Sequence, residues 1–178
     1  MPGMNDGYES ARQQRNWLER LGDKIPGYRG FQDRELRRDV DKLQREQLAK
    51  ELGRVKAAAR NTARAYTDAG QIGLLDRFDR LDRRLDGVSQ AVRFADYGQS
   101  GLFDPVKIGE ADLDRLYQFD LSFVEEIEAL ASEVAVLPQP GAGDASAALE
   151  GAIARVDALT RRWAERDTVI GDVVRAGS

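Results

Sequence analysis

The sequence predicts an all-α protein: an elongated antiparallel bundle of four long helices plus a short N-terminal helix, with coiled-coil-like packing. The first reason is the stretch from Asp33 to Asp68, which has no proline and a single glycine and is rich in good helix formers. The second is that three later stretches repeat their apolar residues every seven positions, the pattern by which long helices pack along one another. No stretch shows a strand pattern.

The chain before the long helix is expected to be irregular at both ends. Residues 1–8 combine glycine, proline and asparagine without periodicity and should form a mobile tail. Ser10 can cap a short helix that Gly22 would end. The loop 22–31 is rich in glycine and proline but carries apolar side chains, which we expect to fold back onto the first third of the long helix.

One segment near this loop resembles a known family. Residues Ile25-Pro26-Gly27-Tyr28-Arg29-Gly30-Phe31, followed by the charged helix start Arg34-Glu35-Leu36-Arg37-Arg38-Asp39, are similar to the opening of an uncharacterised family of bacterial all-α proteins. The resemblance covers about residues 17–45. It implies an all-α fold and brings no activity with it.

The long helix changes its apolar face after its first third. Between Leu43 and Leu48 the apolar spacing is five residues where the pattern requires four, and such a skip breaks a helical seam locally. We therefore expect the first third to pack on one neighbour and the rest on different ones. The first stripe is Leu36, Val40 and Leu43; the second is Leu48, Leu52, Val55, Ala59, Thr62 and Tyr66.

Three further helices are predicted at residues 71–96, 110–137 and 145–175, within one domain that spans 1–178. The connection 96–109 is long for a compact domain. The connection 138–144 is rich in proline and glycine, and Asp144 can cap the last helix. The apolar seams are Leu74, Phe78, Leu81, Leu85, Val88, Val92 and Ala95; Leu113, Leu116, Phe123, Ile127, Leu130, Val134 and Leu137; and Leu149, Ala152, Val156, Leu159, Trp163, Ile170 and Val173.

Asp120 is a carboxylate on an otherwise apolar seam, and a buried carboxylate requires a partner. If the last two helices form a hairpin centred near Gly141, Asp120 lies opposite a stretch that offers Arg162, Trp163 and Arg166. One interpretation is a register device, in which a charge pair fixes how two helices slide. The other is a ligand-binding or proton-handling acid inside the bundle. We favour register, because no second acid or base accompanies Asp120 on its seam.

Composition argues against several kinds of active site. The chain has no cysteine and no histidine, which removes disulfides, cysteine nucleophiles, histidine bases and almost every transition-metal site. No phosphate-binding or nucleophile motif is present, so we predict no catalytic residue, no metal and no cofactor. The formal net charge of −4 comes from mixed signs, so no nucleic-acid partner is expected. No apolar run reaches the length of a bilayer span, and we expect a cytoplasmic location.

These observations predict a non-catalytic helical interaction or scaffold protein, whose partner is another protein or a second copy. Two partner-binding surfaces are candidates: a corner formed by Trp17, Tyr28 and Phe31, and the loop residues Leu102 and Phe103. Exposed aromatic patches are uncommon unless they bind something. Ordinary core packing is the alternative for both surfaces, and it is the favoured one for the corner.

Two other functions are compatible with the sequence. In the first, a peripheral membrane scaffold, Arg34, Arg38, Lys42 and Arg45 on one side of the long helix would bind anionic lipid. A solvated face is the favoured interpretation of this basic side, because acidic residues interrupt it. In the second, a small molecule would bind in the bundle near Asp120.

Overall fold

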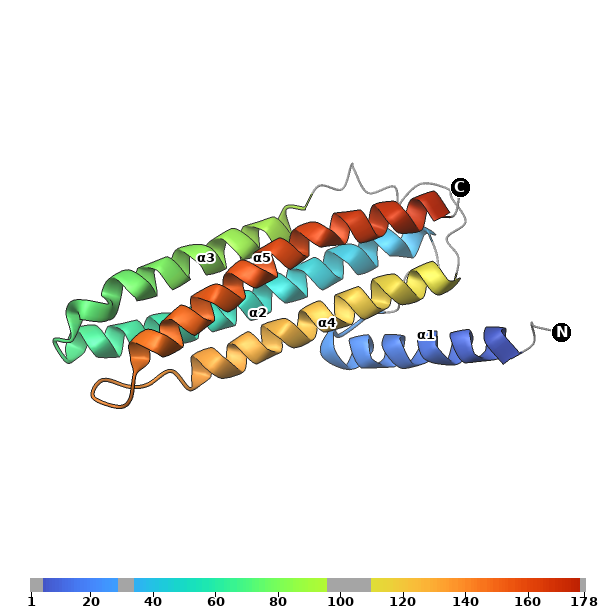
Figure 1. Cartoon of the computed structure of the whole chain (residues 1–178). Coiled ribbons are helices and arrows are strands. Elements are labelled where there is room, and N and C mark those ends of the chain that lie inside the picture. The colour runs from blue at the N-terminus through green and yellow to red at the C-terminus, as the bar shows by residue number, and fades with distance from the viewer. Residues whose placement is uncertain (1–4, 29–33, 96–109, 177–178) are drawn as a thin grey trace. The chain divides into compact units, whose positions relative to one another are not determined.

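The computed structural model describes residues 5–28, 34–95 and 110–176, and every regular element in these ranges is a helix (Figure 1). The predicted all-α fold is therefore confirmed. The elements are α1 (Asn5–Lys24), α2 (Arg34–Asp68), a 3₁₀ turn η1 (Ile72–Leu74), α3 (Leu75–Arg93), α4 (Glu110–Ala135) and α5 (Ala145–Ala176).

The described chain divides into two compact units. Unit 1 holds α1 and the segments 34–47 of α2, 110–124 of α4 and 164–176 of α5. Unit 2 holds the segment 48–68 of α2, η1, α3, and the segments 125–135 of α4 and 145–163 of α5. That the whole chain forms one domain stays a prediction.

In unit 2, ion pairs define how α2 runs relative to α3. Arg60 on α2 donates from Nε to Oδ1 of Asp82 on α3 at 2.6 Å. Lys56, one turn earlier on α2, pairs with Asp86, one turn later on α3. Going back along one helix while going forward along the other identifies an antiparallel hairpin, as predicted.

The last two helices form a second antiparallel hairpin within unit 2. Glu133 on α4 accepts from Nε of Arg155 on α5 at 2.8 Å, and Glu126, two turns earlier, pairs with Arg162, two turns later, at 3.1 Å. The turn between them ends where Asp144 accepts a hydrogen bond from the backbone N–H of Ala147 at 3.1 Å, so the predicted cap is confirmed.

The helices α3 and α5 run parallel, which completes an up-and-down order in unit 2. Arg77 pairs with Glu150 at 3.0 Å and Arg84 pairs with Asp157 at 3.3 Å, so seven residues along one helix match seven along the other. The core behind these pairs contains the predicted seams, together with Ala49, Ala145 and Ile153, which lie on none of them. Its buried seam residues are Leu48, Leu52, Val55, Ala59, Thr62, Tyr66, Phe78, Leu81, Leu85, Val88, Val92, Ile127, Leu130, Val134, Leu137, Leu149, Ala152, Val156, Leu159 and Trp163.

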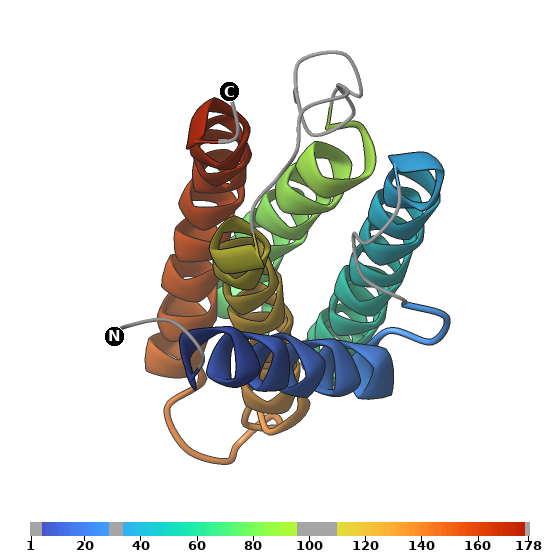
Figure 2. The same cartoon turned by 90° about the vertical axis from the view of Figure 1, so that its right-hand side faces the viewer.

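In unit 1, α1 lies at an angle to the segments of α2, α4 and α5 instead of alongside them (Figure 2). Leu21 and Ile25 at its C-terminal end are buried. Gly27 follows with φ at +84°, and the N–H of Tyr28 donates to the carbonyl of Ile25 at 3.0 Å. This tight turn lies against Leu43, since a Cβ on Gly27 would be 3.2 Å from Cδ2 of Leu43. The predicted folding back of the loop onto α2 is confirmed for these residues.

Both predicted ends of the first helix need correction. The predicted start at Ser10 is wrong, and so is the predicted tail for residues 5–8, because α1 already begins at Asn5. Residues 1–4 lie outside the described part of the chain. Gly22 lies inside α1 and does not end it, since a helical glycine costs only about 1 kcal/mol. The helix ends at Lys24 because Pro26 disfavours the helical conformation at the residue before it.

Several ends of the later helices also differ. The helix predicted for 71–96 ends at Arg93, and the helix predicted for 145–175 ends at Ala176. The helix predicted to begin at residue 71 begins at Leu75, after the 3₁₀ turn. The helix predicted to reach Leu137 ends at Ala135, where the N–H groups of Val136 and Leu137 donate to carbonyls three residues back, at 3.3 Å. Such bonds tighten a last helical turn.

The five-residue step between Leu43 and Leu48 lies where buried charged residues replace apolar ones on α2, and the two units of the chain divide this helix between residues 47 and 48. Asp41 and Arg45 are buried, with 6% and 3% of their surface exposed. When they are included, the buried positions continue at alternating steps of four and three through Leu48 and Leu52. The apolar residues skip a position here because the buried positions are occupied by the charged Asp41 and Arg45.

Candidate functional site

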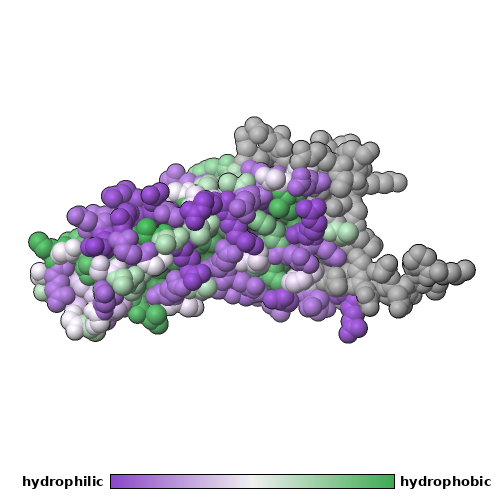
Figure 3. All heavy atoms as spheres, viewed as in Figure 1, coloured by the Kyte–Doolittle hydropathy of each residue, from purple (hydrophilic) through white to green (hydrophobic). Residues whose placement is uncertain are grey.

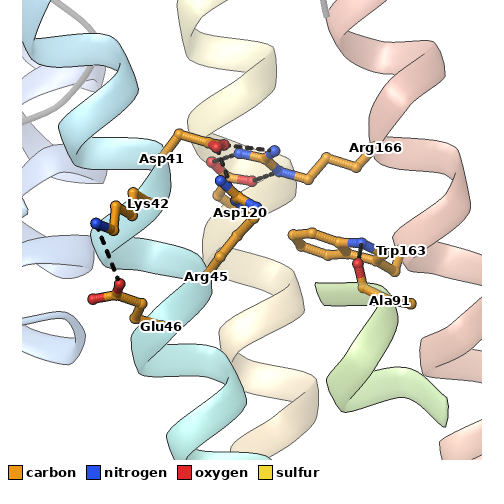
Figure 4. Close-up of polar contacts among 8 residues, drawn as sticks. All are labelled: Asp41, Lys42, Arg45, Glu46, Ala91, Asp120, Trp163 and Arg166. Atoms are coloured by element: carbon orange, nitrogen blue, oxygen red, sulfur yellow. Dashed lines mark hydrogen bonds and ion pairs between the residues drawn. The ribbon is translucent and has the colours of Figure 1, made fainter. Parts of the chain in front are cut away.

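A layer of four charged side chains lies in the core of unit 1, and we call it the polar layer (Figure 4). Asp41 and Arg45 come from α2, Asp120 from α4 and Arg166 from α5. Each occupies a seam position of its helix, which is why all four point inward. None exposes more than 6% of its surface.

Arg166 is the centre of the polar layer. Its Nε donates to Oδ1 of Asp120 at 2.8 Å and its Nη2 to Oδ2 of the same carboxylate at 3.3 Å. Its Nη1 donates to Oδ1 of Asp41 at 3.0 Å, and the other oxygen of Asp41 accepts from Nε of Arg45 at 2.9 Å. Two carboxylates thus face two guanidinium groups, and the layer is balanced in charge.

Burial and the neighbouring charges shift the pKa values of Arg166 and Asp120. Burial alone would lower the pKa of Arg166, but the carboxylates of Asp120 and Asp41 outweigh it and raise the pKa well above its ordinary value. Burial raises the pKa of Asp120, against the opposing effect of Arg166. Arg166 therefore stays charged, and removing either partner would leave an uncompensated charge in the core.

Two neutral side chains accompany the polar layer. Gln44 is fully buried, and its amide favours the ionised form of Asp120 without making a well-formed hydrogen bond to any described residue. Tyr28 is buried with its ring edge against Tyr117, at 6.4 Å between ring centres. Burial, followed by the nearby carboxylate of Asp120, raises the pKa of the Tyr28 phenol well above its ordinary value.

Of the three partners predicted for Asp120, the structure brings only Arg166 to it. Arg162 pairs with Glu126 instead, at 3.1 Å. The indole N–H of Trp163 donates to the backbone carbonyl of Ala91 at 3.1 Å. A hairpin centred on Gly141 would place Asp120 opposite Arg162. In the structure Asp120 lies opposite Arg166, which is one helical turn further along α5.

Sequence reasoning missed Asp41, Gln44 and Arg45, because it followed only apolar residues. A usable signal was present: extending the four-and-three spacing of Leu48 and Leu52 backwards leads directly to Arg45 and Asp41. The acid and bases that accompany Asp120 therefore come from α2 and α5 and not from its own seam, which is why a search along that seam did not find them.

The basic side proposed for lipid contact is also changed by the structure. Arg45 is buried in the polar layer and cannot face a membrane, which corrects its assignment to a solvated side. Lys42 is exposed and lies 3.8 Å from Glu46. The side chains of Arg34 and Arg38 lie outside the part of the chain that the structure describes.

The structure removes Tyr28 from the candidate partner-binding corner of Trp17, Tyr28 and Phe31. Tyr28 exposes only 6% of its surface and is a core residue. Trp17 is half-buried, with the guanidinium of Arg20 5.2 Å from its ring centre. Phe31, Leu102 and Phe103 lie outside the described residues, so their role in binding stays a prediction.

A surface groove in unit 2 lies along α4 and α5, and we call it the α4–α5 groove. It encloses about 500 Å³. Val136, which is 78% exposed, is one of the residues that line it, and a Cβ added to Gly151 would have open space around it. Hydrophilic residues cover most of the described surface in the view of Figure 3. The groove is lined by Glu133, Val136, Ala148, Gly151, Ala152, Arg155 and Ala158.

The fold and the polar layer define an all-α protein whose helices are joined by buried charge pairs. No family model, no curated protein and no solved structure matches the chain. The resemblance of residues 17–45 to a bacterial all-α family stays a prediction. Within the described ranges, no group of acidic residues is arranged to hold a metal ion, and no helix is long and apolar enough to cross a membrane.

Proposed function

We propose that this chain is a non-catalytic helical interaction protein, which binds a helix of another protein or of a second copy in the α4–α5 groove. The observation that carries the proposal is the groove itself, whose lining combines alanine and glycine with the exposed Val136 and the paired Glu133 and Arg155. Small side chains let two helix backbones approach closely, and an exposed apolar side chain beside them gains from being covered.

The polar layer supports a scaffold role more than a chemical one. Both oxygens of Asp120 are engaged by Arg166, so a small molecule near Asp120 would have to displace a guanidinium. The membrane alternative loses support as well, because Arg45 is buried and Lys42 lies beside Glu46. A cytoplasmic location remains our expectation from the sequence.

The test compares what three forms of the tagged full chain retain from their own cell. These are the unchanged chain, Gly151→Leu, which fills the α4–α5 groove, and Gly87→Leu, which adds the same side chain to an exposed glycine of α3 with open space around it. We expect the unchanged chain and Gly87→Leu to retain a bound partner, which is either another protein or a second copy carrying a different tag. Gly151→Leu should no longer retain it. If both variants keep every interaction, the groove is not a binding surface and the proposal fails.

A further inference from the structure

We infer that the occupant of the α4–α5 groove is α5 of a second copy of this chain, packed antiparallel across a twofold axis that passes between Ala152 and Ile153. This inference rests on the proposed function and names its partner. It starts from the exposed side of α5, where Ala147, Gly151, Ala154 and Ala158 are small and exposed at helical spacing. Gly151 and Ala158 of this line also line the groove.

The spacing of these small residues is self-complementary. An antiparallel copy centred between Ala152 and Ile153 places Ala147 opposite Ala158 and Gly151 opposite Ala154 of the other chain. The same surface then serves both partners, as a twofold interface requires. No large side chain interrupts the contact, so the two helices can pack closely along the line.

The charges at the two ends of the line are complementary in the same arrangement. Asp144 and Arg161 are both exposed and lie at equal distances from the proposed axis, with opposite signs. Each copy therefore offers Asp144 to Arg161 of the other, and the pair forms twice. Asp144 caps α5 with one carboxylate oxygen only, which leaves its second oxygen for the guanidinium.

The charges on the flanks do not oppose this packing, because they are neutralised within the chain. Glu150 is held by Arg77 and Arg80 from α3, and Arg155 is held by Glu133 from α4. Glu150 and Arg155, which flank the line of small residues, thus already have partners within their own chain. A membrane or an unrelated acidic or basic protein would gain no comparable charge match.

The experiment measures the mass of the purified full chain by sedimentation equilibrium over a range of concentrations. We expect a dimer that Gly151→Leu weakens at least about tenfold and Gly87→Leu leaves unchanged. A monomer at all concentrations, or a dimer equally stable in both variants, overturns the inference. In either case, a different protein lost by Gly151→Leu in the capture experiment would still support the proposed function.

Charge exchange between copies provides a second readout. Arg161→Glu alone and Asp144→Lys alone should each dimerise more weakly than the unchanged chain, since each places like charges opposite one another twice. A mixture of the two variants should form a heterodimer, because both contacts are then between opposite charges. Circular dichroism verifies that Asp144→Lys keeps its helices. Failure of the mixture to associate more strongly than either variant alone rejects the antiparallel register.

Discussion

Arg166 on α5 holds the carboxylate of Asp120 on α4 with two nitrogens of one guanidinium, at 2.8 and 3.3 Å, while its third nitrogen bonds Asp41 on α2. This contact distinguishes between registers of α5 against α4 that apolar packing alone would accept equally. A slide of seven residues along α5 would keep leucine-like residues on the seam but would place Leu159 or Val173 opposite Asp120. The polar layer therefore fixes one register among several that the apolar pattern allows.

Arg166→Met should lower the free energy of unfolding by about 3–5 kcal/mol, because it leaves Asp41 and Asp120 buried with only Arg45 to balance them. Methionine retains much of the volume, so the loss reports charge and not a cavity. Urea denaturation followed by circular dichroism measures it.

The matched control is Arg162→Met, four residues earlier on α5. Arg162 pairs with Glu126, and both side chains are about one-third exposed, at 34% each. Such a pair contributes only about 0–1 kcal/mol. Equal losses in the two variants would show that the polar layer does not depend on the central arginine.

The helices could be predicted from the sequence because apolar spacing and the absence of proline decide them locally. The seams of α3, α4 and α5 were found by their repeats, and most of the named residues that the structure describes are buried. Tyr117, Leu121, Val124 and Ile153 are buried as well but were not on the predicted seams. Asp120 stood out for the same reason, as a charge on an apolar seam.

The polar layer as a whole could not be predicted in the same way. Asp41 and Arg45 looked like the charged residues of any exposed helix face, and only their partners on α4 and α5 make their burial favourable. The start of α1 and the position of the last hairpin depended on turn geometry, which shifts a register by a few residues without changing any periodicity.

The phenol of Tyr28 should make stability fall at alkaline pH. Burial, and then the nearby Asp120, raise its pKa in the folded chain, whereas a tyrosine in the unfolded chain loses its proton near about pH 10. Above that pH the folded state holds more protons than the unfolded state, so the free energy of unfolding decreases as pH rises. Below that pH, Tyr28 is protonated in both states and does not make the free energy of unfolding depend on pH.

Tyr28→Phe tests this dependence directly. Urea denaturation at about pH 9 and about pH 11 should show a smaller decrease for the variant than for the unchanged chain. Ultraviolet titration of the folded chain should show a late phenol ionisation that is absent from Tyr28→Phe. The same decrease in both proteins would mean that another group titrates.

Two glycines should respond to alanine with opposite signs. Gly27 has φ at +84°, and an added Cβ would lie 3.2 Å from Cδ2 of Leu43, so Gly27→Ala should lower the free energy of unfolding by at least about 1–2 kcal/mol. Gly87 lies inside α3, where an added Cβ meets nothing within 4 Å, so Gly87→Ala should raise it by up to about 1 kcal/mol. Thermal and urea denaturation of both variants measure the difference. If Gly27→Ala instead raised the free energy of unfolding, Gly27 would not have a positive φ in the folded chain. The turn before α2 would then not lie against Leu43 as described.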